Sequence, residues 1–141
     1  MSIRTNVRVA VQLFSHFCTD HEALAGFYIE AFGLSPVAEV GSPIFIALDA
    51  GNVALGFHAA DAYDLLGIAD RKGGVTANHV TFDLGTVAAV DAAVDELIAL
   101  GATLIQGPFT TYYGARQTVL ADPEGNVFRI SDTQPALTFG S

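Results

Sequence analysis

The stretch Asp122–Ile130, which reads DPEGNVFRI, predicts a tight turn followed by a strand. Pro123 fixes φ at a value that suits a turn, and Gly125 and Asn126 tolerate positive φ. The chain should therefore reverse direction here and re-enter a sheet.

The strand after this turn places Arg129 on the face opposite the core. Successive side chains of a strand point to opposite faces, so Phe128 and Ile130 share one face and Arg129 lies on the other. Two large apolar side chains belong on the core side. The surroundings of Arg129 on the other face should therefore decide the function.

The first half of the chain predicts a strand, a helix and three further strands. Residues 7–17 are rich in Val and Phe, which is typical of a strand. Thr19 and Glu22 form a capping box that should open a helix, and Gly33 should end it. The buried face of this helix should carry Leu24, Phe27, Tyr28 and Ala31. The three short strands are expected over residues 37–40, 44–49 and 53–58.

The second half repeats this order. A strand is expected over residues 78–84, and a helix capped by Thr86 should end at Gly101. The buried face of this helix should carry Val90, Val94, Leu97 and Ile98. The strands that follow should cover residues 102–106, 116–121 and 126–131. The chain is thus expected to be a single domain, residues 1–141, built of module 1 (about 7–58), a linker (59–77) and module 2 (about 78–132).

The composition fits one compact domain with a sizeable core. The chain has 141 residues, of which 51% are hydrophobic and 15% charged. A mean hydropathy of +0.43 suggests a further apolar surface, such as a subunit interface. The net charge of −9 argues against nucleic acid as a partner.

The location is expected to be cytoplasmic, with no membrane association. No apolar run reaches the roughly 18–20 residues that span a bilayer, and the first residues lack the apolar segment of a signal peptide. The single cysteine, Cys18, fits a reducing compartment and is expected to be a buried thiol.

Four sequence features together resemble one known superfamily. They are Phe27-Tyr28 before Gly33-Leu34, His79-Val80, Tyr113-Gly114-Ala115-Arg116, and the DPEGN turn. In this order, inside a repeat, they resemble the glyoxalase / bleomycin-resistance / extradiol-dioxygenase superfamily, also called vicinal oxygen chelate proteins. The resemblance implies an α+β fold of two tandem βαβββ modules, whose curled mixed sheet forms a cleft. It also implies a homodimer.

The resemblance implies a divalent metal in the cleft, held by His or Gln and by Glu from each module. In this sequence His79 matches the second-module histidine, but Arg129 stands where the glutamate belongs. The first-module positions fall on Leu55 and on Leu13, or on Gln12 if the register is one residue earlier. A guanidinium about 6 Å from a divalent ion costs roughly 5 kcal/mol at an effective dielectric of about 20. We therefore expect no metal, no cofactor and no catalytic residue of the glyoxalase type.

His79 and Arg129 are the first candidate ligand-binding residues, together with Asp83 on the same strand face as His79. A guanidinium can hold an anionic or carbonyl group. The alternatives are a histidine satisfied by local hydrogen bonds and an ion pair between Arg129 and Asp83.

Aromatic side chains are the second group of candidates. Tyr112 and Tyr113 precede a strand and could stack on a flat ligand, and Phe57 could supply the opposite wall. The alternatives are packing of the two tyrosines at a dimer interface or a helix end, and ordinary core packing for Phe57. His16, His21 and His58 are not expected to form a replacement metal site.

These observations favour a metal-independent small-molecule binding protein that resembles the bleomycin-resistance branch. Its ligand would be an aromatic or cationic compound, such as an antibiotic. One alternative is a lyase, isomerase or dioxygenase with an atypical metal site around Gln12 and His79. Another is a module without a ligand that serves dimerisation. The sequence does not identify the ligand.

Overall fold

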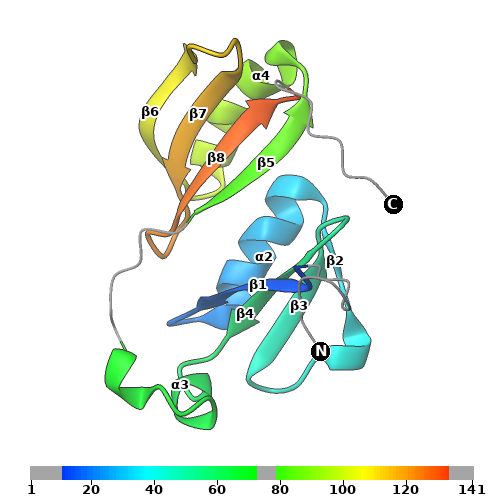
Figure 1. Ribbon diagram of the computed structural model, residues 1–141, viewed down its shortest axis with the longest axis vertical. Coiled ribbons are helices and arrows are strands. Elements are labelled where there is room, and N and C mark those ends of the chain that lie inside the picture. Colours follow the sequence, from blue (N-terminus) through cyan, green and yellow to red (C-terminus); the bar gives the residue numbers. More distant parts are fainter. Residues whose placement is uncertain (1–10, 73–78, 134–141) are drawn as a thin grey trace, which may run out of the picture. The chain divides into compact units, whose positions relative to one another are not determined.

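The structure is a computed structural model that describes residues 11–72 and 79–133. The chain forms two units, each of which contains one four-stranded mixed sheet (Figure 1). Unit 1 comprises Met1–Ala25 and Gly33–Lys72, and unit 2 comprises Gly26–Phe32 and Gly73–Ser141. The α+β fold of two βαβββ modules is therefore confirmed.

The sheet of unit 1 has the strand order β1-β4-β3-β2. Strand β1 (Leu13–Phe17) is parallel to β4 (Ala54–His58), which is antiparallel to β3 (Phe45–Asp49). The strand expected over residues 37–40 is wrong. Instead, β2 (Ser35–Pro36) pairs with β3, and the next residues form the 3-10 helix η1 (Ala38–Val40).

Residues 38–40 leave the sheet although β3 continues beside them. The register of β2 would place Ala38 and Glu39 opposite Ile46 and Phe45, which both belong to β3. Instead, the Val40 N–H donates to the Val37 carbonyl and the Gly41 N–H to the Ala38 carbonyl. Local hydrogen bonds therefore satisfy these backbone groups in place of sheet bonds.

Helix α2 (His21–Phe32) begins and ends close to the expected positions. The Asp20 carboxylate accepts a hydrogen bond from the Ala23 N–H at 3.0 Å, so the first turn is capped one residue later than the Thr19 capping box predicted. Gly33 follows the helix with φ of 67°, the left-handed conformation of a C′ glycine. Leu24, Phe27 and Tyr28 are buried as expected, whereas Ala31 is half-buried.

The expected linker contains regular structure in its described part. Helix α3 (Ala62–Leu65) and the 3-10 helix η2 (Ala69–Arg71) follow β4. The remainder, residues 73–78, lies outside the described residues, as do residues 7–10 of the first predicted strand.

The sheet of unit 2 repeats the topology with the order β5-β8-β7-β6. Strand β5 (Val80–Gly85) is parallel to β8 (Val127–Asp132), which is antiparallel to β7 (Arg116–Ala121). Strand β6 (Thr103–Thr110) is longer than the predicted residues 102–106 because it extends along β7 up to the Thr110–Arg116 pair.

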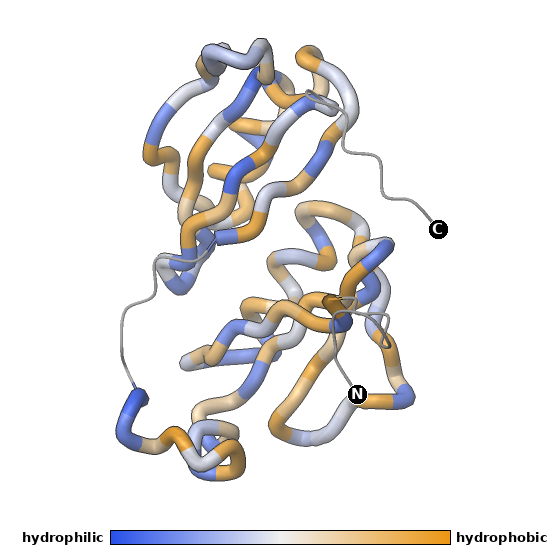
Figure 2. The backbone as a smooth tube through the Cα atoms, in the orientation of Figure 1, coloured by the Kyte–Doolittle hydropathy of each residue, from blue (hydrophilic) through white to orange (hydrophobic). Residues whose placement is uncertain are grey.

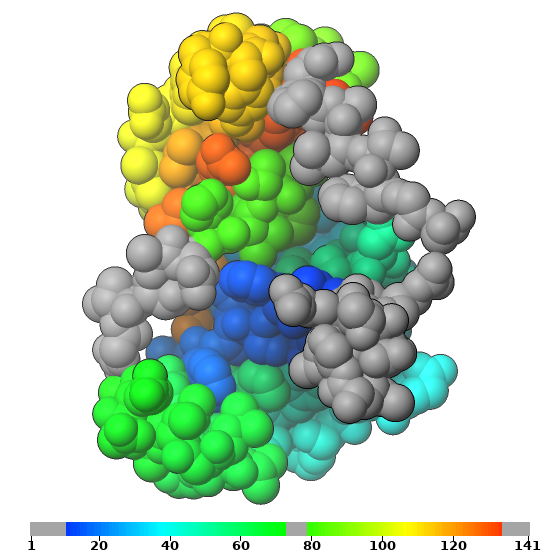
Figure 3. Space-filling view, viewed as in Figure 1, coloured from blue at the N-terminus to red at the C-terminus, as the bar shows by residue number. Residues whose placement is uncertain are grey.

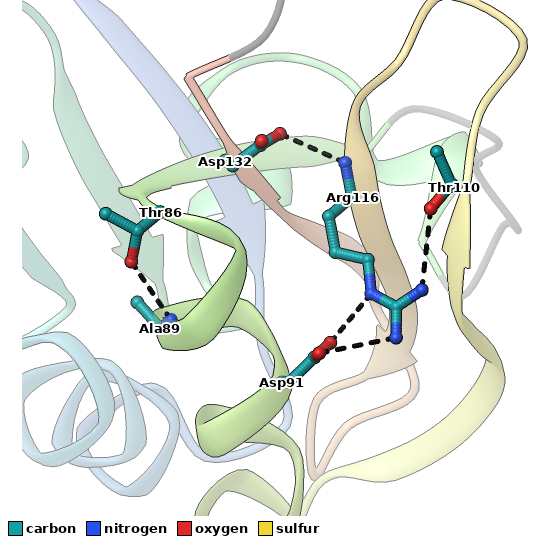
Figure 4. A network of polar contacts seen from close by, with 6 residues as sticks. All are labelled: Thr86, Ala89, Asp91, Thr110, Arg116 and Asp132. Carbon is teal, nitrogen blue, oxygen red and sulfur yellow. Dashed lines mark hydrogen bonds and ion pairs between the residues drawn. The ribbon is translucent and has the colours of Figure 1, made fainter.

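Helix α4 (Val87–Ala99) packs on this sheet. Thr86 caps it as predicted, with its hydroxyl oxygen accepting from the Ala89 N–H (Figure 4). Val90, Val94 and Leu97 are buried, but Ile98 is 43% exposed, so its place on the buried face was wrong.

An ion pair ties α4 to the sheet. The Arg116 Nε donates to Asp91 at 2.8 Å, and the Asp132 carboxylate accepts from the Arg116 N–H at 3.0 Å (Figure 4). The side chain of Asp91 is partly exposed, and exposed pairs of this kind contribute about 0.2–1 kcal/mol.

The core of unit 2 joins the end of α2 to the strand that the DPEGN turn introduces. The Phe32 ring stacks on Phe82 at 4.1 Å, and Tyr28 meets Phe128 edge to face at 6.1 Å. Phe128 and Ile130 are fully buried, which confirms their predicted core side. Figure 2 shows hydrophilic stretches (blue) between hydrophobic ones (orange) along the strands of this sheet.

A prediction follows from the close packing around Gly56 on β4. A Cβ at this position would lie 2.6 Å from the Ser15 hydroxyl oxygen and 2.8 Å from a Phe45 ring carbon. Gly56→Ala should therefore lower the free energy of unfolding by about 1–3 kcal/mol, measured by urea denaturation.

Gly26 supplies the matched control for this substitution. It lies within α2, and a Cβ there would meet nothing within 4 Å. Gly26→Ala should raise the free energy of unfolding by about 0.5–1 kcal/mol because alanine has the higher helix propensity. Equal effects of the two substitutions would contradict the packing at Gly56.

Candidate binding face of unit 2

The candidate site lies on the face of the unit 2 sheet that bears Arg129. In the strand register Thr81 is opposite Arg129, while Asp83 and Gln117 flank Ser131. Alternation places all five side chains on one face. This set of Thr81, Asp83, Gln117, Arg129 and Ser131 is called the Arg129 face below.

Arg129 is held by two neutral oxygen atoms. Its Nε donates to Thr81 Oγ1 at 3.0 Å and its Nη1 donates to Gln117 Oε1 at 3.2 Å. Over residues 11–72 and 79–133, the one ion pair present joins Arg116 to Asp91, so Arg129 has no carboxylate partner there. Arg129 is half-buried.

The suggested ion pair between Arg129 and Asp83 is not formed. Asp83 Oδ1 instead accepts from the Gly85 N–H at 2.8 Å and from the Thr133 hydroxyl at 2.6 Å. Asp83 thus fastens the end of β5 to the residue that follows β8, and it is exposed.

Gln117 organises this face, and sequence analysis missed it. Its side chain is 4% exposed. Because Arg129 can only donate, the Gln117 carbonyl oxygen must face the guanidinium. The Gln117 Nε2 then donates to the Tyr113 hydroxyl oxygen at 3.0 Å and to Ser131 Oγ at 3.3 Å. No local signal distinguished it, because β7 (Arg116–Ala121) also carries the polar residues Arg116 and Thr118.

The two candidate tyrosines lie in the loop between β6 and β7, and only one is tied to the Arg129 face. Tyr113 is 41% exposed and bonded to Gln117, whereas Tyr112 is fully exposed and meets the Tyr113 ring edge to face at 5.0 Å. The Thr111 hydroxyl oxygen accepts from the Ala115 N–H and shapes the loop. Figure 3 shows the gold tip of this hairpin protruding at the surface.

His79 is exposed and directly precedes β5. Alternation from Thr81 places it on the side of the Arg129 face. Its predicted role as a ligand contact stays a prediction.

Phe57 does not reach an exposed face. It is fully buried in unit 1, where it stacks on His16 at 5.5 Å. The alternative of ordinary core packing therefore holds for Phe57, because its strand position points to the apolar side of the sheet together with Leu55.

The register also corrects the first-module metal position. Thr81 is opposite Arg129 in unit 2, and Ser15 is opposite Gly56 in unit 1, each on the first strand of its module. Gly56, not Leu55, is therefore the counterpart of Arg129. Leu13 is then the counterpart of His79, and Gln12 lies just before β1.

The side chains do not fit the divalent metal of the superfamily. Neither Gly56 nor Leu13 offers a donor, and Arg129 brings a cation to the carboxylate position. Within residues 11–72 and 79–133, no three His, Cys, Asp or Glu side chains lie close enough together to hold a metal ion.

Comparison with known proteins agrees with this fold. The protein-family sequence model described as a glyoxalase-like domain matches residues 9–131. The chain belongs to the glyoxalase-like family. This family is part of the glyoxalase / bleomycin-resistance / dioxygenase superfamily that the sequence motifs resemble. A search of curated proteins gave no match.

Solved structures of the glyoxalase-like superfamily share the fold. A family enzyme from Burkholderia phytofirmans PsJN, titled glyoxalase/bleomycin resistance protein/dioxygenase, is 41% identical with a TM-score of 0.83, covering 86% of this chain and 96% of its own. A glyoxalase-related enzyme from Fulvimarina pelagi is 23% identical with a TM-score of 0.76, covering 94% and 93%. A lactoylglutathione lyase from Agrobacterium tumefaciens is 21% identical with a TM-score of 0.69, covering 89% and 94%.

No helix within residues 11–72 and 79–133 is both long enough and apolar enough to cross a bilayer.

A pH dependence of stability is predicted from His58 of unit 1. Burial beside the Phe17 and Phe45 rings lowers the pKa of His58 below its usual 6.5. Above pH 6.5 the folded and unfolded states are both neutral at His58. As the pH falls from 6.5 through the lowered pKa, the unfolded state binds the proton first, so the free energy of unfolding decreases.

Thermal unfolding of wild type and His58→Gln from pH 7.5 to pH 5 tests this prediction. The melting temperature of the wild type should fall more steeply with decreasing pH than that of the variant. Parallel curves would show that His58 does not contribute.

Proposed function

We propose that this glyoxalase-like protein is a metal-independent binding protein for small aromatic molecules. The observation that supports the proposal most is Arg129, a guanidinium at the position where a metal ligand would stand. It is fixed by Thr81 and Gln117 rather than neutralised by a carboxylate.

The binding residues of the proposal lie on and around the Arg129 face. Arg129 and His79 orient the polar part of the ligand, and Asp83 borders it. Tyr113 and Tyr112 supply exposed aromatic surface, and each ring stacked on a flat ligand adds about 0.5–1.5 kcal/mol. Phe57 is not part of the proposed site because it is buried.

The proposal also covers the cellular location, the oligomeric state and the compounds that the protein would bind. It functions in the cytoplasm as a homodimer, and antibiotics are among the aromatic compounds it would sequester, as the name of the bleomycin-resistance branch implies. Light scattering combined with size-exclusion chromatography tests the dimer.

Two measurements test the binding function itself. Metal analysis of the purified protein should find no stoichiometric Zn, Ni, Mn or Fe, and EDTA should leave the melting temperature unchanged. A thermal-shift screen of aromatic compounds should find ligands, since a ligand present at 100 times its Kd adds about 2.7 kcal/mol of stability. Stoichiometric metal would favour a metal-dependent lyase, isomerase or dioxygenase, and a screen without hits would overturn the proposal.

A further inference from the structure

Arg129 can only donate hydrogen bonds, and this fixes the direction of the bonds that run from it through Gln117 to Tyr113. Arg129 donates to the Gln117 carbonyl oxygen, so the Gln117 amide nitrogen faces the Tyr113 hydroxyl. This nitrogen also can only donate. The Tyr113 oxygen must therefore accept, and its own proton is directed away from Gln117.

The face thus offers donors to a ligand. Arg129 uses Nε and Nη1 within the protein, and among the described residues its Nη2 makes no hydrogen bond. The Tyr113 hydroxyl proton is the second donor. Both groups are bonded to the same Gln117 side chain, so they lie one carboxamide apart on a partly exposed surface.

The acceptors nearest to Arg129 are occupied by protein donors. Ser131 Oγ accepts from Gln117 and donates to the Asp132 carbonyl oxygen at 2.9 Å. Further along β5, Asp83 Oδ1 accepts from Gly85 and Thr133, while Asp83 Oδ2 accepts from no described residue. A ligand that presents two acceptors therefore finds donors at Arg129 and Tyr113, and Asp83 is the one charged acceptor in this set of five residues.

We propose that the ligand bears a carboxylate, which Arg129 and Tyr113 bind together, and that Gln117 is the positioning residue for both. This inference rests on the proposed binding function and specifies its ligand class. A carboxylate matches a guanidinium in charge and geometry. It also explains why, in a chain of net charge −9, this guanidinium lacks an acidic partner within the described residues.

Asp83 is the charged group nearest to Arg129 in the strand register, and its negative charge opposes the binding of a carboxylate. Asp83 is two residues along β5 from Thr81, which is about 7 Å. Its charge should weaken the binding of an anion, so Asp83→Asn should tighten carboxylate binding about two- to threefold. His79 lies the same distance from Thr81 in the other direction.

Matched pairs of ligands provide the test. Benzoate and 2-naphthoate are compared with benzamide and 2-naphthamide, which have nearly the same shape but no charge. The Kd values are measured by NMR titration of the ¹⁵N-labelled protein, with the Arg129 Nε–H signal as a local reporter. The wild type should bind each carboxylate at least about tenfold more tightly than its amide, and the preference should decrease with added salt.

Three variants separate the roles of the residues. Arg129→Gln should abolish the preference for carboxylates. Tyr113→Phe should reduce it about five- to tenfold, because the ring remains but the donor is lost. Gln117→Glu should also abolish it, because a carboxylate at this position pairs with Arg129 and competes with the ligand, although residue 117 need not touch the ligand itself.

The outcomes distinguish this inference from the proposed function. Binding of the amides as tightly as the carboxylates would overturn the carboxylate inference and leave the binding function standing. Failure of all four compounds and of the wider aromatic screen would overturn both. A carboxylate preference that survives Gln117→Glu, with the fold intact by circular dichroism, would refute the positioning role of Gln117.

Discussion

Asp122→Ala is expected to lower the free energy of unfolding by about 3–4 kcal/mol, the largest effect of any single substitution outside the apolar core. Asp122 is 3% exposed and anchors the DPEGN turn. Its carboxylate accepts from the backbone N–H groups of Glu124 and Asn126 and from the Asn126 side chain, at 2.9–3.1 Å. It also accepts from the Tyr28 hydroxyl at 2.8 Å.

The size of the effect follows from the donors that would lose their partner. Hydrogen bonds to a charged group contribute about 1.5–3 kcal/mol each when buried, and a buried donor left without an acceptor costs about 1–3 kcal/mol. These contributions are not additive because the turn can relax. Removal of the carboxylate should also loosen the start of β8 and the contact of Tyr28 with the turn.

Urea denaturation of two further variants provides the controls. Tyr28→Phe removes one of these hydrogen bonds and should cost about 1–2 kcal/mol. Asp91→Ala removes the carboxylate of the partly exposed Asp91–Arg116 pair and should cost about 1 kcal/mol or less. If Asp122→Ala costs no more than Asp91→Ala, the carboxylate does not hold the turn.

Arg129→Glu is expected to raise the affinity for Ni²⁺ at least about 100-fold over the wild type. The substitution replaces a fixed cation with the carboxylate that the superfamily places in the equivalent position. At about 6 Å and an effective dielectric of about 40, suited to a half-exposed group, removing the repulsion alone contributes roughly 3 kcal/mol. His79 directly precedes the neighbouring strand β5, two residues before Thr81, and can act as a second donor.

Isothermal titration calorimetry with Ni²⁺ checks this expectation. Arg129→Gln should gain less than Arg129→Glu because it relieves the repulsion without adding a ligand. The double variant Arg129→Glu/His79→Ala should lose most of the gain. Equal Ni²⁺ affinity of wild type and Arg129→Glu would mean that the guanidinium is not what excludes a metal.

Local signals in the sequence were sufficient for most of the fold. The Thr86 cap, the glycines that end α2 and α4, and the alternation of Phe128 and Ile130 about Arg129 all reflect interactions within a few residues. The errors arose where a distant partner decided the outcome. Residues 38–40 form a 3-10 helix with local backbone bonds where a strand paired with β3 was expected, and Ile98 is exposed where burial on α4 was expected.

The candidate site was predictable only in part for the same reason. Arg129, Asp83, His79 and the tyrosines could be chosen from their types and strand positions. Gln117 could not, because its importance comes from the pairing of β7 with β8 across the sheet. Phe57 was misplaced because alternation identifies two faces of a strand without saying which one the helix covers.

The sequence by itself determined that this chain is a repeated βαβββ protein in which Arg129 lies on the face of its strand opposite Phe128 and Ile130. Turn residues, caps and alternation are local properties of the chain and can be read in order. Only the tertiary structure decided that Arg129 is held by Thr81 and Gln117, that Asp83 is engaged elsewhere, and that Tyr28 secures Asp122. Those contacts join residues 12 to 94 positions apart, and hydrogen bonds over such separations depend on the register of strands and on the packing of helices.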